Sequence, residues 1–436
     1  MSPETVGIIG FLLMFVFLYM GMPIGFCMGV TGFLGQIVLF GWKGSLTQLA
    51  MVPYASVASF TFCVVPLFML MGELAWASGL TEGAYSFVYK VIGRFRGGLA
   101  MSTVGASAIF AACTGSSLAS AATFTKVSLP SMRARNYDVG LATGSIAAGG
   151  TLGILIPPSN PMIVYSIITG ASIGKLFIAG VVPGILLTLL FMLAIYVVVR
   201  IKPSMGPAGE KAGFMEMLRE GKSLWPAILL IGSVLVGLWG GLFSASEAGA
   251  VGAVISMFIL IGRKWRSSPK LLLEGLRSTA KSTAMIFMIV IGAMIFGDFM
   301  TVSNLPALLV EFIRNYNVPP LMVIFVLMVI YVILGALMDE LAIMLITLPV
   351  IMPALNHLHI DPVWFGILFI INQQMGLILP PVGMVVFVMA GMIPDVPMYT
   401  IYKGIIPFAL AMFVCIVIIM FFPEIAMWLP THMIGR

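Results

Sequence analysis

Apolar residues in this chain form long unbroken runs, such as Leu186 to Val199, and polar residues gather in short clusters between them. A strand of a membrane barrel would instead alternate apolar and polar positions over about ten residues. The pattern therefore predicts an all-α polytopic membrane protein. The first two helices are expected near Val6 to Gly21 and Pro23 to Phe40, and the last crossing near Tyr402 to Phe422.

Composition supports the same fold class. Of the 436 residues, 61% are hydrophobic and 9% are charged, and the mean hydropathy is +1.13. Soluble domains carry about a quarter charged residues, so an ordinary soluble protein is excluded. At about 20 apolar residues per crossing, the chain has room for roughly a dozen elements in a lipid bilayer. Its Lys and Arg residues form no long basic stripe, so nucleic acid is not an expected partner.

Basic clusters orient the predicted helices. They occur near Lys90 to Arg96, at Arg133 and Arg135, from Arg200 to Lys222 and from Arg263 to Lys281. Positively charged loops between membrane helices lie in the cytoplasm. Counting crossings from these loops places both termini on the periplasmic side.

Two stretches do not fit simple crossings, because each has a polar break in its middle. Gly98 to Pro130 breaks at Thr114 to Ser117, and Pro319 to Pro353 breaks at Gly335 to Glu340. Each is expected to be a re-entrant helical hairpin, the first opening to the cytoplasm and the second to the outside. The alternative is a pair of full crossings joined by a tight loop, although each arm is only marginally long enough to span.

Short motifs recur between the two halves of the chain. Gly72-Glu73-Leu74 corresponds to Gly297-Asp298-Phe299 at an offset of 225, and Gly153 to Ser159 corresponds to Gly376 to Val382 at an offset of 223. Because only the first hairpin has positively charged flanks, the two copies are expected to be inverted in the membrane. Secondary transporters use inverted repeats for alternating access, although such repeats also occur in channels.

Each Gly-x-x-x-Pro-Pro motif is expected to split its helix, since proline removes a backbone donor and clashes with the preceding turn. Unwound backbone at membrane depth supplies carbonyls for Na⁺ and helix N-termini for an anion. We expect the first hairpin tip and first broken helix to meet, and the second pair likewise. Sodium site one is predicted at Thr114, Gly115, Ser116, Gly153, Ile156 and Ser159. Sodium site two is predicted at Gly335, Met338, Asp339, Gly376, Leu379 and Val382, and the substrate contacts at Ser116, Ser117, Ser159 and Asn160.

Several polar residues admit two interpretations. Asp339 is either an ion ligand or an N-terminal cap, with capping slightly favoured. Glu73 and Asp298 occupy equivalent repeat positions and are expected at helix ends. An intramembrane enzyme would need a nucleophile with a base, and the serines lack a His or Lys partner; Lys126 is expected to extend to the cytoplasmic surface. The chain is therefore interpreted as a carrier and not an enzyme.

Four motifs in this sequence, in the same order, resemble those of a known family, and the resemblance spans essentially the full length of the chain. Ala112 to Ser117, Gly153 to Ser159, Met338-Asp339 and Gly376 to Gly383 resemble, in order, the large membrane subunit of tripartite ATP-independent periplasmic (TRAP) transporters. The resemblance implies a sodium-driven, elevator-type permease of the bacterial inner membrane that imports a small carboxylate, such as a C4-dicarboxylate or a sialic acid. It further implies two partners, a small membrane subunit of four helices and a periplasmic substrate-binding protein.

The resemblance also suggests which parts move. The transport domain would comprise residues 90–170 (hairpin 98–130, broken helix 138–169) and 282–395 (hairpin 319–356, broken helix 362–392). The scaffold would comprise 1–89, 171–281 with its cytoplasmic arms, and the C-terminal helix in 396–436. One departure is Leu379, where the family usually has Thr, which would weaken the second sodium site. The alternative function is a stand-alone sodium-coupled anion symporter of the same broad architecture.

Overall fold

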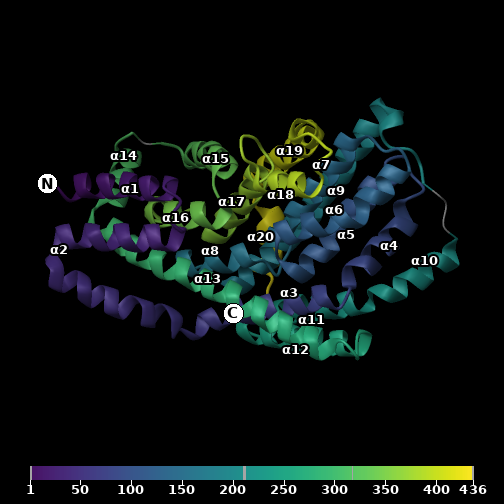
Figure 1. The fold of residues 1–436 in the computed structure, drawn as a ribbon. Coiled ribbons are helices and arrows are strands. Elements are labelled where there is room, and N and C mark those ends of the chain that lie inside the picture. The colour runs from purple at the N-terminus through teal and green to yellow at the C-terminus, as the bar shows by residue number, and fades with distance from the viewer. Residues whose placement is uncertain (1, 210–212, 317, 435–436) are drawn as a thin grey trace.

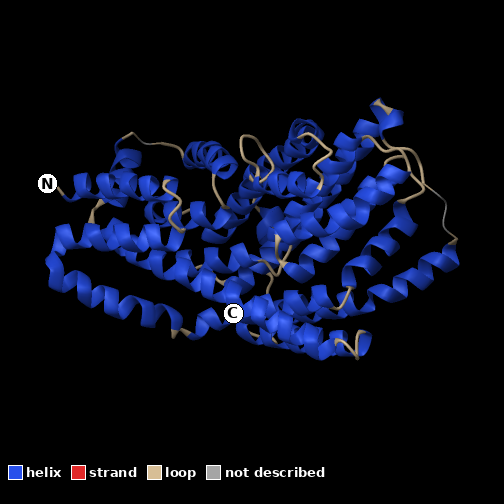
Figure 2. Ribbon diagram, in the orientation of Figure 1, coloured by secondary structure: helices blue, strands red, loops and turns tan. Residues whose placement is uncertain are grey.

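The structure, a computed structural model, describes residues 2–209, 213–316 and 318–434. These residues fold into helices, as Figure 2 shows. Eight of the described helices are long and apolar enough to cross a membrane. The prediction of an all-helical membrane protein is confirmed.

The first repeat runs from the N-terminus to α9 and contains the first hairpin and the first broken helix. Its α-helices are α1 (Pro3–Tyr19), α2 (Ile24–Val57), α3 (Val64–Ala77), α4 (Leu80–Ile92), α5 (Gly98–Thr114), α6 (Ser117–Ala134), α7 (Val139–Thr151), α8 (Asn160–Thr169) and α9 (Ile173–Ile201). Short 3₁₀ turns lie at Phe60–Cys63 and Leu152–Ile154. The predicted second helix ends near Phe40 as expected, because Gly41 takes a positive φ of 78° and turns the chain. Glycine adopts this conformation without steric cost. A further helical segment, which was not predicted, follows Gly41 and completes α2.

The second repeat follows a connecting segment that holds 3₁₀ turns at Pro203–Met205 and Lys222–Leu224 and the short helix α10 (Phe214–Gly221). Its elements are α11 (Trp225–Trp239), α12 (Ala245–Arg263), α13 (Ser268–Val302), α14 (Leu305–Asn315), α15 (Pro320–Leu337), α16 (Glu340–His357), α17 (Pro362–Gly376), α18 (Met384–Met392), α19 (Met398–Phe421) and α20 (Glu424–Thr431). Helix α20 follows the last predicted crossing and was not predicted from the sequence.

Both predicted hairpins and both predicted broken helices are present. The hairpin arms α5 and α6 are separated by Gly115-Ser116, and α15 and α16 by Met338-Asp339. The broken helices are α7 with α8 and α17 with α18, each interrupted at its Pro-Pro motif. In Figure 1, α16 lies on one side of the broken helices and α5 and α6 lie on the other.

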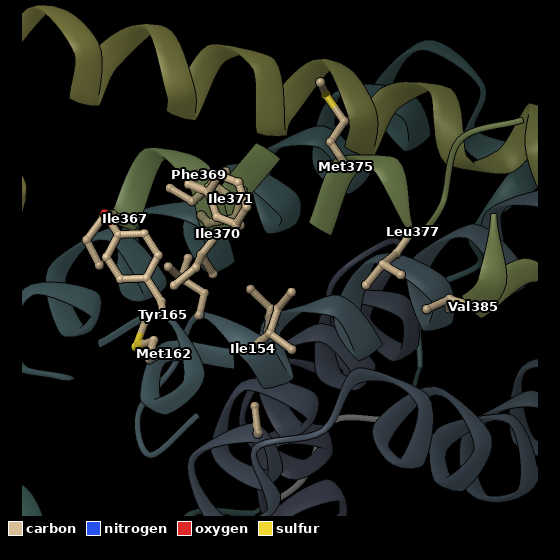
Figure 3. Close-up of a cluster of buried hydrophobic side chains, with 14 of the residues drawn as sticks. Ile154, Met162, Tyr165, Ile367, Phe369, Ile370, Ile371, Met375, Leu377 and Val385 are labelled. Carbon is tan, nitrogen blue, oxygen red and sulfur yellow. The ribbon is translucent and has the colours of Figure 1, made fainter. Parts of the chain in front are cut away.

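The core between the broken helices is apolar and aromatic (Figure 3). Tyr165 of α8 packs 6.1 Å from the ring of Phe369 in α17, and its hydroxyl donates to the Pro362 carbonyl at 2.7 Å. Tyr331 of α15 packs edge-on against the same Phe369 at 4.6 Å. Burial of such rings holds the two repeats together at the centre of the protein.

Helices α9 and α19 pack against the hairpin and broken-helix unit. α19 contacts α7, α9 and α17, and α9 contacts α5 as well as α19. Between α7 and α19 the backbones nearly touch, because a Cβ on Gly404 would overlap the Gly140 carbonyl oxygen. On the opposite side, α3 packs against α12 and α13, and α13 packs along α2.

Candidate substrate cavity and ion sites

The tip of the first hairpin lies directly on the break of the first broken helix. A Cβ added to Gly153 would lie 2.7 Å from the Ser116 carbonyl oxygen, and one on Gly115 would lie 2.7 Å from the Pro158 carbonyl oxygen. Gly115 also takes a positive φ of 60° that ends α5. Only glycine permits both the close approach and the turn, so these residues fix the geometry of predicted site one.

Two helix N-termini meet at this contact. Ser116 caps α6, its Oγ accepting the Ala119 N–H at 3.4 Å, and Ser159 caps α8, its Oγ accepting the Met162 N–H at 3.5 Å. The Ser159 hydroxyl in turn donates to the Ile154 carbonyl at 2.6 Å. Helix N-termini carry partial positive charge and favour an anion beside them.

A cavity of about 630 Å³ opens beside these N-termini, and we call it the hairpin-1 cavity. One wall comes from α3 and α13, with Glu73 accepting a hydrogen bond from Ser278 at 2.6 Å. The other wall comes from the hairpin and α8, and includes Thr114, Ser116, Lys126 and Asn160. Lys126 therefore lines the cavity, and among the described lining residues it is the only cation.

The four predicted substrate residues divide into two pairs. Ser116 and Asn160 line the hairpin-1 cavity, whereas Ser117 and Ser159 are buried and do not. Within the described part of the chain, the Ser117 Oγ has no hydrogen-bond partner. A buried hydroxyl without a partner costs free energy, so this atom fits a site that a bound cation or water completes. Carbonyl and hydroxyl oxygens are the donors that a hard cation prefers.

The second hairpin tip also meets its broken helix. Gly335 and Gly376 are in backbone contact, since a Cβ on Gly376 would lie 2.6 Å from the Gly335 carbonyl carbon. The Val382 N–H donates to the Ala336 carbonyl at 3.1 Å, and Asp339 caps α16 by accepting the Leu341 N–H at 3.0 Å. The favoured interpretation of Asp339 as a cap is thus confirmed. Leu379 offers only its backbone oxygen, which lies near Gly383.

A cluster of buried amide side chains that was not predicted from the sequence lies beside site two. Asn372, Gln373 and Gln374 are fully buried in α17, and both amide atoms of Gln373 and of Gln374 lack partners among the residues that the structure describes. The Gln373 Oε1 lies 3.4 Å from the position of a Gly335 Cβ, next to the hairpin. Glu340 of the same hairpin has a buried oxygen without a partner. The sequence does contain a signal for this cluster, because three consecutive amide residues interrupt an otherwise apolar segment just before Gly376. These oxygens fit a cation near site two better than Leu379 alone does.

A second, smaller cavity matches the first through the repeat. This hairpin-2 cavity of about 290 Å³ lies between α13, α16 and the end of α8, and the residues that α13 contributes include Met294, Gly297, Asp298 and Thr301. Each of these residues is 225 positions after one that lines the hairpin-1 cavity: Met69, Gly72, Glu73 and Trp76. The same helix face therefore borders a cavity in each repeat. Glu73 and Asp298 lie in the last turns of their helices, as predicted, and Asp298 accepts a hydrogen bond from Gln48 at 3.2 Å.

Paired hairpins, paired broken helices and matched cavities define the chain as a multi-pass membrane transport protein built from two repeats. Residues 11–425 match the family described as tripartite ATP-independent periplasmic transporter, DctM component, and the chain belongs to this family. It is a TRAP transporter large permease, a multi-pass protein of the inner membrane.

Individual relatives agree with this assignment. The C4-dicarboxylate TRAP transporter large permease protein DctM of Pseudomonas aeruginosa is 35% identical over 92% of this chain and 93% of its own length. The sialic acid TRAP transporter large permease protein SiaM of Vibrio cholerae is 29% identical over 96% and 97%. The crystal structure of the Alcanivorax borkumensis YdaH transporter, described as having an unusual topology, shares the fold with a TM-score of 0.60 and 15% identity over the whole of both chains.

Proposed function

We propose that this permease imports a small organic anion, coupled to Na⁺ and supplied by a periplasmic binding protein together with a small four-helix membrane subunit. The observation that carries the proposal is the pair of helix N-termini at Ser116 and Ser159, beside a cavity lined by Ser116 and Asn160. This arrangement favours a carboxylate at the first repeat. At the second repeat, the Asp339 carboxylate already occupies the N-terminus of α16 and would repel an anion. Relatives named for C4-dicarboxylate and sialic acid, which are carboxylic acids, support this substrate class.

Sodium is proposed at both hairpin tips. At site one the donors would be backbone oxygens near Ser116 and Gly153 and the unpartnered Ser117 hydroxyl. At site two they would be backbone oxygens near Gly335 and Gly376, joined by the Gln373 amide oxygen. Because a cation at site one would lie beside the anion, each would stabilise the other, which couples their binding.

The transport step is proposed to be an elevator movement. The hairpin-1 cavity, larger than its repeat-related partner, would be open to the cytoplasm under the positive-inside rule, and movement of the hairpins would close it while opening the hairpin-2 cavity. Unlike the sequence-based division, we include α9 and α19 in the moving unit, because a Cβ on Gly404 of α19 would overlap Gly140 and one on Gly180 of α9 would lie 2.6 Å from the Leu155 carbonyl oxygen. We also place all of α13, including Ser282, in the scaffold, because α13 packs along α2 and against α3. Both termini would lie in the periplasm.

The test is uptake of labelled organic acids into proteoliposomes that contain this chain and its small subunit. The expected result is uptake of a carboxylate that requires both an inward Na⁺ gradient and the binding protein. Uptake without the binding protein would favour the alternative, a stand-alone sodium-coupled symporter. Uptake that is indifferent to Na⁺ would contradict the coupling proposal.

Lys126 is expected to attract the anion without being indispensable. Replacing it with Ala should raise the KM for uptake about fivefold, because removing one partly solvated cation costs about 1 kcal/mol. Lys126→Arg should retain most of the affinity, and the difference should shrink in high salt as the charge is screened. Lys270→Ala, which removes an exposed cation outside the cavity, is the control. An unchanged KM in Lys126→Ala would contradict the proposal that Lys126 attracts the anion.

A further inference from the structure

A groove between α11 and α12 lies away from the substrate cavity and both ion sites. It encloses about 430 Å³ and is lined by Ser223, Trp225, Leu229, Ile255, Phe258 and Arg263, with Pro226, Ile259 and Gly262 completing the wall. Trp225 and Phe258 are 61% and 64% exposed, so the groove opens on the outer surface of the protein.

The groove has a polar end and an apolar end. Arg263 lies at the end of α12 and Trp225 at the start of α11, and both line the groove. Ile255 is eight residues before Arg263, which is about 12 Å deeper along the helix at 1.5 Å per residue. Phe258 and Leu229 lie between these depths. An amphipathic occupant with its polar group beside Arg263 and its apolar part along Ile255 would match this profile.

The basic residues at the Arg263 end of the groove, and the position of this end near the membrane surface, indicate that the polar group of the occupant is an anion. Lys264 and Arg266 are exposed within three residues of Arg263, and Lys222 is exposed three residues before Trp225, so this end of the groove is strongly basic. Tryptophan at a helix end marks the interface between hydrocarbon and headgroups. Basic pockets between membrane helices on the cytoplasmic side bind anionic lipid headgroups.

Space for a headgroup exists beside the arginine. Gly262 has no atom within 4 Å of the position that a Cβ would take. Among the described residues, the Arg263 guanidinium makes one long hydrogen bond, from Nη1 to the Gly79 carbonyl at 3.4 Å, which leaves further donors of its five to point into the groove. A phosphate can therefore approach the guanidinium without displacing a side chain.

We propose that this groove binds one anionic phospholipid, with its phosphate on Arg263 and an acyl chain along Leu229, Ile255 and Phe258. The site is separate from transport and does not depend on the proposed function. Its role would be to fix α11 against α12 at the edge of the protein, where both helices face lipid.

The experiment uses the full-length chain in nanodiscs and the fluorescence of Trp225, obtained as the difference between the protein and its Trp225→Phe variant. Phosphatidylglycerol or phosphatidylcholine, brominated in one acyl chain, is titrated as quencher. Phosphatidylglycerol is expected to reach half-maximal quenching at a mole fraction about fivefold lower, the ratio expected for one basic residue near a membrane surface. Arg263→Gln should abolish this preference, and Gly262→Leu should weaken quenching by both lipids.

The matched control is Arg266→Gln, which removes an exposed arginine three residues away that does not line the groove. It should keep the preference for phosphatidylglycerol, and all variants should elute as a single species with unchanged thermal unfolding. Equal quenching by the two lipids, or loss of the preference in Arg266→Gln as well, would overturn the proposal. Absence of any Trp225 quenching would also overturn it, because it would mean that no lipid acyl chain enters the groove.

Discussion

Replacing Ser116 and Ser117 together with Ala is expected to lower kcat/KM for uptake about a hundredfold or more while the protein stays folded. Ser116 lines the cavity at the α6 N-terminus, and the buried Ser117 hydroxyl has no partner in the described part of the chain. Hydrogen bonds to charged groups contribute about 1.5–3 kcal/mol each, so losing two is a large loss for ligand binding. The folded state loses one cap, which costs about 1 kcal/mol. Uptake into proteoliposomes and thermal unfolding measure the two effects.

Two control variants separate site chemistry from packing. Ser116→Thr keeps both the hydroxyl and the cap and should retain most of the uptake. Ser128→Ala removes another buried hydroxyl of α6, but one that lies about 16 Å along the helix from the hairpin tip, and should transport normally. Normal transport by the double alanine variant would contradict both the anion and the sodium assignment at this hairpin tip.

A reversible cross-link across the hairpin-1 cavity is expected to stop transport. Thr123 of α6 and Ser282 of α13 line opposite walls, and cysteines at these positions can be joined by a linker that contains a disulfide. If the hairpin moves past α13, the linker holds the cavity in one state and uptake falls to background. Reduction of the linker should restore uptake.

The control pair lies within the proposed moving unit. Arg133 of α6 forms an ion pair with Asp395, which follows α18, at 2.7 Å. Cysteines at these two positions, joined by the same linker, should leave uptake largely unchanged because both move together. Full transport by the Thr123–Ser282 cross-linked protein would refute the elevator movement, whatever the substrate.

The positions of the two hairpins and the two helix breaks were predictable because each depends on local chemistry. Proline and glycine interrupt a helix wherever they occur, and the Thr114 to Ser117 segment combines a turn glycine with a capping serine. The contact of each tip with its break was also predictable, since unwound backbone at membrane depth must be buried against protein. The close backbone contacts of Gly115 with Pro158 and of Gly335 with Gly376 confirm this expectation.

Which of the predicted substrate residues line the cavity was not predictable. Ser116 and Asn160 line the cavity while their neighbours Ser117 and Ser159 are buried beneath it, a distinction that depends on how each helix is rotated about its axis. The cavity-lining position of Lys126 was likewise not predicted: its side chain is exposed and also borders the cavity, opposite a wall that contains Glu73. One residue step turns a helical side chain by about 100°, so a small difference in rotation exchanges a lining position for a buried one.

The sequence by itself determined that the chain is a helical membrane protein with two copies of a hairpin and a broken helix, because hydropathy, proline and glycine act locally. Only the tertiary structure decided which faces meet: that Met69, Gly72, Glu73 and Trp76 border one cavity while their repeat counterparts border another, and that α19 packs on α7. The reason is that helix packing depends on side-chain shape at both surfaces at once. Gly404 opposite Gly140 permits a backbone contact that neither helix specifies alone.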